Sequence, residues 1–226
     1  MSRNNLLGAV LDLLFPSRCV FCRDILKSGE VGICSCCQNK LPWIVGQEAE
    51  QKFEFISLCV SPLWYQSDVR DSIRRYKFHD SSGYAKTYGR LLAQCITDHL
   101  EGKYDLITWV PLSAKSLKKR GYDQSMLLAM ATALELNEVA VETLRKTRNT
   151  DTQSSLKDDS ARRANVLGAY DVIDPELVVG KRILLIDDVV TTGSTISECA
   201  RTLLTVGAKD VICAVLTRSR AENSKK

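Results

Sequence analysis

Beyond about residue 50, the chain alternates short apolar runs with longer stretches in which apolar residues recur every three to four positions. Uninterrupted apolar runs are typical of strands buried on both faces, and the helical spacing is typical of amphipathic helices. The apolar runs predict strands at Phe55–Pro62, Leu106–Pro111, Arg182–Ile186 and Val211–Thr217. The helical spacing predicts helices at Ser81–Leu100, Gln124–Leu136 and Thr195–Val206. This alternation favours an α/β fold.

The N-terminal part of the chain follows a different pattern. Residues 6–15, LLGAVLDLLF, predict a short amphipathic helix, because Asp12 interrupts the apolar run and no small-residue cleavage site follows. No stretch of 18 apolar residues occurs, so we expect no membrane-spanning helix, no membrane partner and a cytoplasmic location. The pattern changes after Pro42-Trp43, which predicts a boundary within residues 42–52 and a division into domains 1–45 and 46–226.

Four of the nine cysteines form two C-x-x-C pairs, which are separated by eleven residues. Each pair lets two thiolates reach one tetrahedral Zn²⁺, and two pairs close the site without an open position for catalysis. We therefore predict a structural zinc ribbon, and a redox dithiol or a site that has lost its metal are the alternatives. Cys36 is an alternative ligand. The predicted ligands are Cys19, Cys22, Cys34 and Cys37. The remaining cysteines are expected in the core: Cys59, Cys95, Cys199 and Cys213.

The composition changes this picture little. The 226 residues are 45% hydrophobic and 26% charged, close to the average of globular chains, which excludes a disordered or fibrous protein. The net charge of +4 is too small for a dedicated nucleic-acid binder. It favours a phosphorylated ligand or weak contact with single-stranded DNA.

The segment ILLIDDVVTTGST, residues 183–195, carries the candidate chemistry. Its apolar start predicts a central parallel strand, so Asp187 and Asp188 fall at the carboxyl end of the sheet, where open α/β folds bind ligands. The turn Thr191–Thr195 leads into a helix, and the spacing of Thr195 and Glu198 predicts a capping box. Gly193 allows close approach, so the turn and the helix N-terminus form a cradle for an anion. The alternative is an ordinary strand end followed by an ordinary helix cap.

This segment resembles the 5-phosphoribosyl-1-pyrophosphate (PRPP) binding motif of type I phosphoribosyltransferases: an apolar strand, two aspartates, two further residues and Thr-Thr-Gly-x-Thr. The resemblance implies that Asp187 and Asp188 hold the ribose hydroxyls and organise Mg²⁺, and that the turn holds the 5-phosphate. The PRPP-binding residues so implied are Asp187, Asp188, Val189, Val190, Thr191, Thr192, Gly193, Ser194 and Thr195. It also implies an open, mostly parallel sheet flanked by helices.

A Cys₄ ribbon ahead of such a domain is similar to the ComF/GntX family, and the similarity spans essentially the whole chain. The matching segments are LLFPSRCVFC at 13–22, IRRYKFHDSSGYAKTYGRLLA at 73–93, VPLSAKSLKKRGYDQSMLLA at 110–129 and ARRANVLGAY at 161–170. The family includes proteins implicated in natural transformation and has no agreed acceptor substrate. The resemblance therefore implies the donor PRPP and competence proteins as partners, but not the acceptor.

The strand end at Trp109 is followed by a short loop, and in type I enzymes such a loop binds pyrophosphate. By that resemblance the pyrophosphate contacts come from Ser113, Ala114, Lys115 and Arg120. The alternative is a solvated helix face carrying these cations. Four nearby residues have no role assigned by the sequence: Tyr76, Lys77, Tyr122 and Gln124.

The long polar stretch from Leu144 to Tyr170 lacks convincing periodicity over its first half. Stretches of this kind are typical of lids or linkers. As a lid it would bring Arg145, Lys146 and Arg148 to the pyrophosphate. A disordered connector is the alternative.

Two functions are compatible with these features. One is transfer of a ribose 5-phosphate group from PRPP to an unknown acceptor with release of pyrophosphate. The other is a non-catalytic PRPP- or nucleotide-binding module that acts through competence partners or single-stranded DNA. The chain has neither a Gly-x-x-x-x-Gly-Lys loop for ATP nor a Gly-x-Gly-x-x-Gly fingerprint for a dinucleotide.

Overall fold

The computed structural model describes residues 16–78, 81–148 and 164–220. Its strands are β1 (Glu50–Phe53), β2 (Ile56–Val60), β3 (Leu63–Trp64), β4 (Leu106–Trp109), β5 (Leu144–Lys146), β6 (Tyr170–Val172), β7 (Arg182–Val190) and β8 (Asp210–Arg218). Its α-helices are α2 (Ser35–Lys40), α3 (Ser67–Phe78), α4 (Tyr84–Leu100), α5 (Ala114–Arg120), α6 (Gln124–Glu135) and α8 (Ser194–Thr205), with 3-10 helices η1 (Gly46–Ala49) and η3 (Pro175–Leu177).

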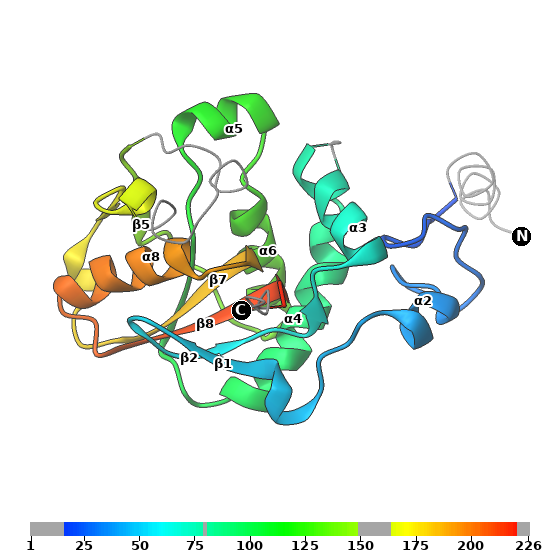
Figure 1. Cartoon of the computed structure of the whole chain (residues 1–226), viewed down its shortest axis with the longest axis horizontal. Helices are drawn as coiled ribbons and strands as arrows, with labels where there is room; N and C mark the ends of the chain where they lie inside the picture. Colours follow the sequence, from blue (N-terminus) through cyan, green and yellow to red (C-terminus); the bar gives the residue numbers. More distant parts are fainter. Residues whose placement is uncertain (1–15, 79–80, 149–163, 221–226) are drawn as a thin grey trace, which may run out of the picture.

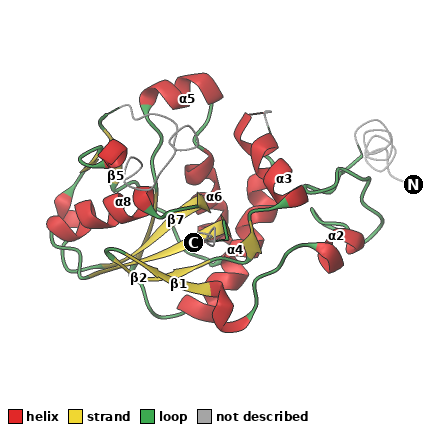
Figure 2. Cartoon of the chain, in the orientation of Figure 1, coloured by secondary structure: helices red, strands yellow, loops and turns green. Residues whose placement is uncertain are grey.

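Six strands form one sheet in the order β1-β2-β8-β7-β4, and β3 pairs with β8 beyond the end of β2. Strand pairs β2–β8, β3–β8, β7–β8 and β4–β7 are parallel, whereas β1 folds back antiparallel on β2. Helices lie on both sides of this sheet (Figures 1 and 2). The predicted open, mostly parallel sheet flanked by helices is therefore confirmed.

Successive residues of β7 face opposite sides of the sheet and contribute to two separate cores. Leu184 and Ile186 pack in a core with residues of α3, α4 and α6, while Ile183 and Leu185 pack in a core with residues of α8. All four side chains are completely buried. A central parallel strand needs apolar residues on both faces, which is why its sequence shows no alternation.

The N-terminal ribbon belongs to the first of these cores. Its cysteines Cys19, Cys34 and Cys37 are buried together with residues of α3 and α4. Two side chains of α3 fix the ribbon backbone: Ser72 donates to the carbonyl of Val20, and Arg75 donates to the same carbonyl at 2.9 Å. In Figure 1 the ribbon accordingly lies against α3, at the end of the molecule opposite α8.

The strands predicted at 106–111, 182–186 and 211–217 correspond to β4, β7 and β8, and the one at 55–62 corresponds to β2. The sequence did not predict β1, because its residues Glu-Gln-Lys-Phe are mostly exposed and show no apolar alternation. Nor did it predict β3, which has two residues.

The predicted helices correspond to α4, α6 and α8, with ends shifted by up to three residues. Helix α3 was not predicted, because its buried stripe is narrow and contains only Val69, Ser72, Ile73 and Tyr76 among many charged residues. The predicted helix at 6–15 lies outside the described residues. Within the described ranges, no helix has both the length and the apolarity needed to cross a membrane.

Helices α4 and α6 cross at Gly89 without space for a side chain. A Cβ at this position would lie 2.8 Å from the carbonyl carbon of Ala131 and 2.9 Å from the backbone nitrogen of Thr132. Backbone atoms on a packed helix cannot move aside cheaply. The absence of a side chain at Gly89 therefore sets how closely α6 approaches α4.

We expect Gly89→Ala to lower the free energy of unfolding by about 1–3 kcal/mol, because the methyl group forces α4 and α6 apart. Gly83→Ala is the matched control, since Gly83 has an ordinary helical backbone and no atom lies within 4 Å of its added Cβ. It should change the free energy by less than about 1 kcal/mol. Urea titrations of both variants measure the difference, and equal values for the two would contradict the close helix crossing.

Candidate functional site

The two aspartates lie within strand β7, not beyond its end as the sequence predicted. The strand continues to Val190, because β8 is long enough to pair with it as far as Arg218. Asp187 is 8% exposed and Asp188 is 2% exposed, so both carboxyl groups are almost completely buried. Two adjacent carboxylates in such surroundings repel each other and need compensating partners.

Asp187 receives its partners from helix α6 and from its own backbone. Its Oδ1 atom accepts hydrogen bonds from Ser125 Oγ and from the Asp188 backbone nitrogen, both at 2.9 Å. Burial and the neighbouring charge of Asp188 nevertheless raise the pKa of Asp187 to about 7. Without a cationic ligand, this carboxyl group therefore carries a proton for much of the time at neutral pH.

The negative charge of Asp188 is compensated by a lysine of helix α3, which is distant in sequence. Lys77, near the C-terminal end of α3, places its Nζ atom 2.9 Å from Asp188 Oδ1. The other carboxylate oxygen, Oδ2, is buried and has no hydrogen-bond partner among the described residues. The site thus contains a carboxylate that is only half satisfied by the protein, which is the property expected of a group that binds a cation or hydroxyl groups.

The turn after β7 has the shape of an anion cradle, but its cap differs from the prediction. Gly193 adopts a left-handed conformation with φ of 81° and is the N-cap of α8, so the helix begins at Ser194. The predicted capping box of Thr195 and Glu198 is wrong. The Glu198 carboxylate instead accepts hydrogen bonds from the Gly168 backbone nitrogen and from Arg201.

Two features of this turn bear on anion binding. The Phe53 ring of β1 fills the space beside Gly193, because an added Cβ would lie 2.2 Å from the ring, so on that side the glycine makes room for a protein side chain rather than for a ligand. The hydroxyls of Thr192 and Ser194 lie 2.8 Å apart at the start of α8. The N-terminus of a helix presents backbone N–H groups without intrahelical acceptors. The turn therefore offers hydroxyl and N–H donors of the kind that phosphate binds.

Asp123 joins two loops of the site and was not singled out from the sequence. Its Oδ1 accepts from the backbone nitrogens of Ser125 and Met126, which caps α6, and its Oδ2 accepts from the Leu112 nitrogen at 2.9 Å. Burial raises the pKa of this carboxyl group. The signal that could have identified it is an aspartate directly before a helical apolar pattern, which is typical of an N-cap.

The predicted pyrophosphate residues are spread over α5 and are not all brought together. Ser113 is buried and uses its hydroxyl to cap α5 by accepting from the Ser116 nitrogen. Ala114 and Lys115 are exposed in the first turn of α5. Arg120 lies at the other end of this helix, donates to Gln124 Oε1 at 2.6 Å and places its guanidinium 5.0 Å from the Phe78 ring centroid.

Three of the four residues without an assigned role, Tyr76, Tyr122 and Gln124, hold α3 against the start of α6. Tyr76 is fully buried and donates to the Gln124 carbonyl at 2.7 Å, while Tyr122 donates to the Tyr76 carbonyl. These contacts fix the end of α3 from which Lys77 reaches Asp188. The run from Gly121 to Gln124 therefore connects the helices around the aspartates.

The two ends of the long polar stretch contain strands β5 and β6, which the sequence did not predict. Strands β5 and β6 pair antiparallel, with Lys146 opposite Tyr170. Burial lowers the pKa of Lys146, whose ammonium lies 5.2 Å from the Tyr170 ring centroid. Arg145 pairs with Asp171 on the surface at 3.8 Å. Residues 149–163, the middle of the predicted lid, lie outside the described residues.

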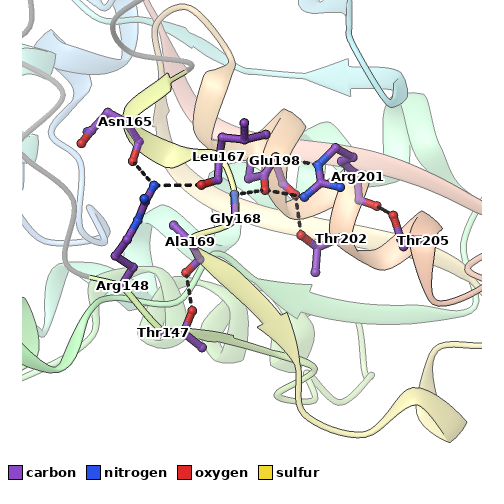
Figure 3. Close-up of polar contacts among 10 residues, drawn as sticks. All are labelled: Thr147, Arg148, Asn165, Leu167, Gly168, Ala169, Glu198, Arg201, Thr202 and Thr205. Atoms are coloured by element: carbon purple, nitrogen blue, oxygen red, sulfur yellow. Dashed lines mark hydrogen bonds and ion pairs between the residues drawn. The ribbon is translucent and has the colours of Figure 1, made fainter.

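Figure 3 shows how the base of this stretch is attached to α8. Arg148 donates to the carbonyls of Asn165 and Leu167, so the outgoing and returning chains are tied to each other. Glu198 of α8 accepts from the Gly168 nitrogen at 2.7 Å and from Arg201. The base of the stretch is therefore fixed on the helix that begins at the anion cradle.

The cysteine pairs converge as the sequence predicted. The sulfur atoms of the four predicted ligands lie within 4.8 Å of one another, and those of Cys22 and Cys34 are 3.6 Å apart. Four sulfurs bound tetrahedrally at about 2.3 Å from one zinc ion would be separated from one another by nearly the distance found between Cys22 and Cys34. Cys36 is exposed and does not belong to this group. The four other cysteines are buried, which confirms that they are core residues.

Comparison with known proteins is consistent with both parts of this structure. A Phosphoribosyl transferase domain model matches residues 123–226, which include the aspartates and the cradle, and a Double zinc ribbon domain model matches residues 10–49. Competence protein F of Haemophilus influenzae is 28% identical over 218 residues, which cover 87% of this chain and 95% of that protein. DNA utilization protein YhgH of Escherichia coli (strain K12) is 31% identical over 231 residues, which cover 92% of this chain and 99% of that protein.

A third relative, Competence protein ComFC of Streptococcus pneumoniae, is 31% identical over 154 residues, which cover 68% of this chain and 65% of that protein. Together with the sheet topology, the family models confirm a type I phosphoribosyltransferase-like fold preceded by a zinc ribbon.

The raised pKa of Asp187 predicts a specific pH dependence of stability in the absence of added Mg²⁺. A carboxyl group with a pKa of about 7 in the folded state, against about 4 in the unfolded state, stabilises the fold fully below pH 4. This contribution is lost as the pH rises through 7. As the pH rises from 5 to 8, the Asp187→Asn variant should therefore become more stable relative to the natural protein, by on the order of 1–3 kcal/mol.

Thermal melts at pH 5 and pH 8 measure this difference. Glu101→Gln is the control, because it neutralises an exposed carboxylate at the C-terminal end of α4. If the stability of the natural protein and of Asp187→Asn changed in parallel across this pH range, the pKa of Asp187 would not be raised.

The cysteine geometry predicts about one Zn²⁺ per chain, bound by thiolates. Cys34→Ser should lose the metal and destabilise the ribbon, because zinc binding by a closed site contributes directly to folding. Cys36→Ser should retain it, since Cys36 lies outside the four-sulfur group. Metal analysis of protein prepared without chelators measures both, and the absence of zinc from the natural protein would refute the assignment.

Proposed function

Because the chain belongs to the ComF/GntX family, which includes Competence protein F and DNA utilization protein YhgH, we propose that it binds PRPP with Mg²⁺ and transfers its ribose 5-phosphate group. The acceptor is unknown, and pyrophosphate is the second product. The observation that carries this proposal is the pair of buried carboxylates in β7, directly before an anion cradle.

The residues at this site fit a hydrated magnesium ion and the ribose hydroxyls. Mg²⁺ prefers carboxylate oxygens and retains several water ligands. Asp187 and Asp188 supply such oxygens, and Oδ2 of Asp188 has no partner within the protein. When bound, the ion would neutralise charge on the departing pyrophosphate.

Lys77 acts as the internal counterion of the ligand-free site. Its ammonium contacts Asp188 Oδ1, an atom that a ribose hydroxyl or a metal-bound water would also use. A ligand that uses Oδ1 would displace Lys77, whereas one that uses only the unpartnered Oδ2 would leave the ion pair in place. The Lys77 side chain is 21% exposed, so the ammonium can turn toward solvent or toward a bound anion.

The cradle and the loop after β4 would hold the two ends of PRPP. The hydroxyls of Thr192 and Ser194 and the start of α8 suit the 5-phosphate. The loop at Leu112 and Ser113 suits the pyrophosphate, because β4 lies next to β7 in the sheet and Asp123 fixes this loop against α6. Arg120 is at the far end of α5, so it reaches the pyrophosphate only if the ligand extends toward Phe78.

In this reaction the bond between the anomeric carbon and pyrophosphate breaks, and its electron pair leaves with the pyrophosphate. Positive charge develops on the ribose ring, where the carboxylates of β7 stabilise it electrostatically. A lone pair of the acceptor then forms the new bond at the same carbon, and the acceptor releases a proton. The chain contributes orientation, charge stabilisation and protection from water rather than a covalent intermediate.

The proposal predicts that PRPP affinity depends on both carboxylates. Asp187→Asn/Asp188→Asn keeps the side-chain size and removes two negative charges, so affinity for PRPP with Mg²⁺ should fall at least about tenfold, or 1.4 kcal/mol. Thermal stability should be retained, since the two carboxylates repel each other when no cation is bound. Calorimetric titration beside a thermal melt measures both quantities.

A matched control removes two charges from the opposite edge of the sheet. Asp98→Asn/Glu101→Gln changes the end of α4, which leads into the start of β4, and should leave PRPP affinity unchanged. Unchanged PRPP binding by a well-folded Asp187→Asn/Asp188→Asn variant would end the proposal. Tight PRPP binding without pyrophosphate release, over a panel of neutral and negatively charged bases and amines, would instead favour the non-catalytic module.

A further inference from the structure

Arg218, the last residue of β8, is a buried cation at the same edge of the sheet as the aspartates. It is 7% exposed and is paired in register with Val190, the last residue of β7. Its guanidinium donates to Gln51 Oε1 at 3.1 Å and to the carbonyl of Glu48. Both acceptor atoms are neutral, and the Glu48 carboxylate compensates the positive charge only from a distance, beyond 4.0 Å.

Two other arginines of this protein have carboxylate partners, whereas Arg75 of α3, like Arg218, donates to neutral acceptors and has a buried Nε atom without a hydrogen-bond partner in the described part of the chain. Arg182 donates to both oxygens of Asp105, and Arg201 donates to both oxygens of Glu198. Within the described ranges, no carboxylate oxygen lies within 4.0 Å of the Arg218 guanidinium, and its Nε atom is buried without a hydrogen-bond partner. Burial lowers the pKa of Arg218. A buried charge without a close counterion and with an unused donor is costly.

A second guanidinium lies beside the first. Arg218 and Arg220 place their Cζ atoms 4.5 Å and 5.1 Å from the ring centroid of the same residue, Trp64 of β3. Arg220 is exposed and Trp64 is half-buried, so this group extends from the surface to the buried Nε atom. Within the described ranges, no carboxylate oxygen lies within 4.0 Å of either guanidinium, so the two cations gathered on one indole form a local excess of positive charge, which attracts an anion.

The position of this group relative to the aspartates indicates which ligand it would face. The sheet order places β7 between β4 and β8. The loop proposed for pyrophosphate follows β4, on one side of Asp187 and Asp188, and Arg218 ends β8 on the other side. In a displacement at the anomeric carbon, the acceptor and the leaving pyrophosphate lie on opposite sides of that carbon.

We propose that Arg218, Arg220 and Trp64 form the acceptor-side anion site, which binds a carboxylate or phosphate group of the acceptor. Its role as the acceptor side rests on the proposed phosphoribosyl transfer, whereas the binding of an anion does not. The acceptor class is thereby a small molecule that carries negative charge in addition to its nucleophilic atom. Neutral bases and simple amines lack the group that this site recognises.

The chemistry of arginine supports this assignment. A guanidinium has five N–H donors in one plane, and two adjacent donors match the two oxygens of a carboxylate or phosphate. Gln51 and Glu48 take two of the five donors of Arg218, and both acceptors hold Nη atoms, so the Nε edge is left for an oxyanion. Arg220 would add a second charge from the surface.

A purely structural role makes a different prediction. Arg218 also attaches η1 and β1 to the end of β8, through Glu48 and Gln51. If this were its whole purpose, removal of Arg218 would lower stability, and the intact protein would show no response to anions at this position. The two roles are therefore distinguished in the natural protein without any variant.

The experiment titrates the full-length protein with benzoate, phenyl phosphate and the neutral analogue benzamide, followed by nitrogen–proton correlation spectra. The reporters are the Nε–H signal of Arg218 and the indole N–H signal of Trp64. Both should shift with benzoate or phenyl phosphate and not with benzamide. A response to one anion alone identifies carboxylate or phosphate as the preferred group. Absence of a shift with both anions, up to tens of millimolar, overturns the proposal.

Two variants test whether the response belongs to Arg218. Arg218→Gln keeps a hydrogen-bonding side chain without the charge and should weaken anion affinity, read from the Trp64 signal, at least about tenfold. Arg90→Gln is the matched control, because Arg90 forms an exposed pair with Glu135 at 3.1 Å, and it should bind anions as the natural protein does. If Arg218→Gln fails to fold, Arg220→Gln should still weaken anion binding. Unchanged binding in every folded variant overturns the proposal.

A second titration, in the presence of saturating PRPP and Mg²⁺, separates this inference from the proposed function. Simultaneous binding of PRPP and the anion supports an acceptor-side site, and mutual exclusion overturns that placement. If PRPP does not bind at all, the proposed phosphoribosyl transfer is refuted. The anion site is still tested independently by the first titration, which contains no PRPP.

Discussion

The structure depends on the burial of two adjacent carboxyl groups in the central strand. Asp187 and Asp188 are each less than a tenth exposed, and water cannot stabilise both charges there. The surrounding helices supply what the strand lacks. Helix α6 donates the Ser125 hydroxyl to Asp187, α3 extends Lys77 to Asp188, and burial raises the pKa of Asp187 to about 7. A ligand with positive charge and hydroxyl groups would complete this arrangement, which is the reason for proposing a metal-bound sugar phosphate.

Helix α3 connects this pair of carboxylates with the zinc ribbon. Lys77 contacts Asp188 near one end of the helix, while Ser72 and Arg75 hold the carbonyl of Val20 between two of the ribbon cysteines. The ribbon cysteines share a core with α3 and α4. If a ligand displaced Lys77, the change would therefore occur on the same helix that contacts the ribbon. The ribbon is part of the packing of the transferase-like domain rather than a separately attached module.

The same edge of the sheet carries three chemically different strand ends. After β4 comes a loop held by Asp123, β7 carries the carboxylates, and β8 ends at a buried arginine that has no carboxylate partner within the described ranges. Negative charge therefore lies on the middle strand, and a cation lies on the side of β8. In the proposed reaction, these three strand ends would face the donor and the acceptor.

Features that depend on local pattern could be predicted from the amino-acid sequence alone. The apolar run before Asp187 predicted a central parallel strand and the cysteine spacing predicted the ribbon, because each requires particular residues at nearby positions. The anion cradle after β7 stays a prediction. The sequence misplaced the start of α8 and missed α3 and β1, whose stability comes from contacts with distant segments.

Only the tertiary structure decided how separate segments complete the site. Lys77 and Asp188 are distant in sequence, as are Ser125 and Asp187, and nothing in the spacing of these residues indicates that they meet. The sequence does not indicate that Arg218 is buried, nor that it has no carboxylate partner within the described ranges. Local patterns specify which groups a strand or turn presents, whereas charge compensation depends on which other elements the packing brings within a few ångströms.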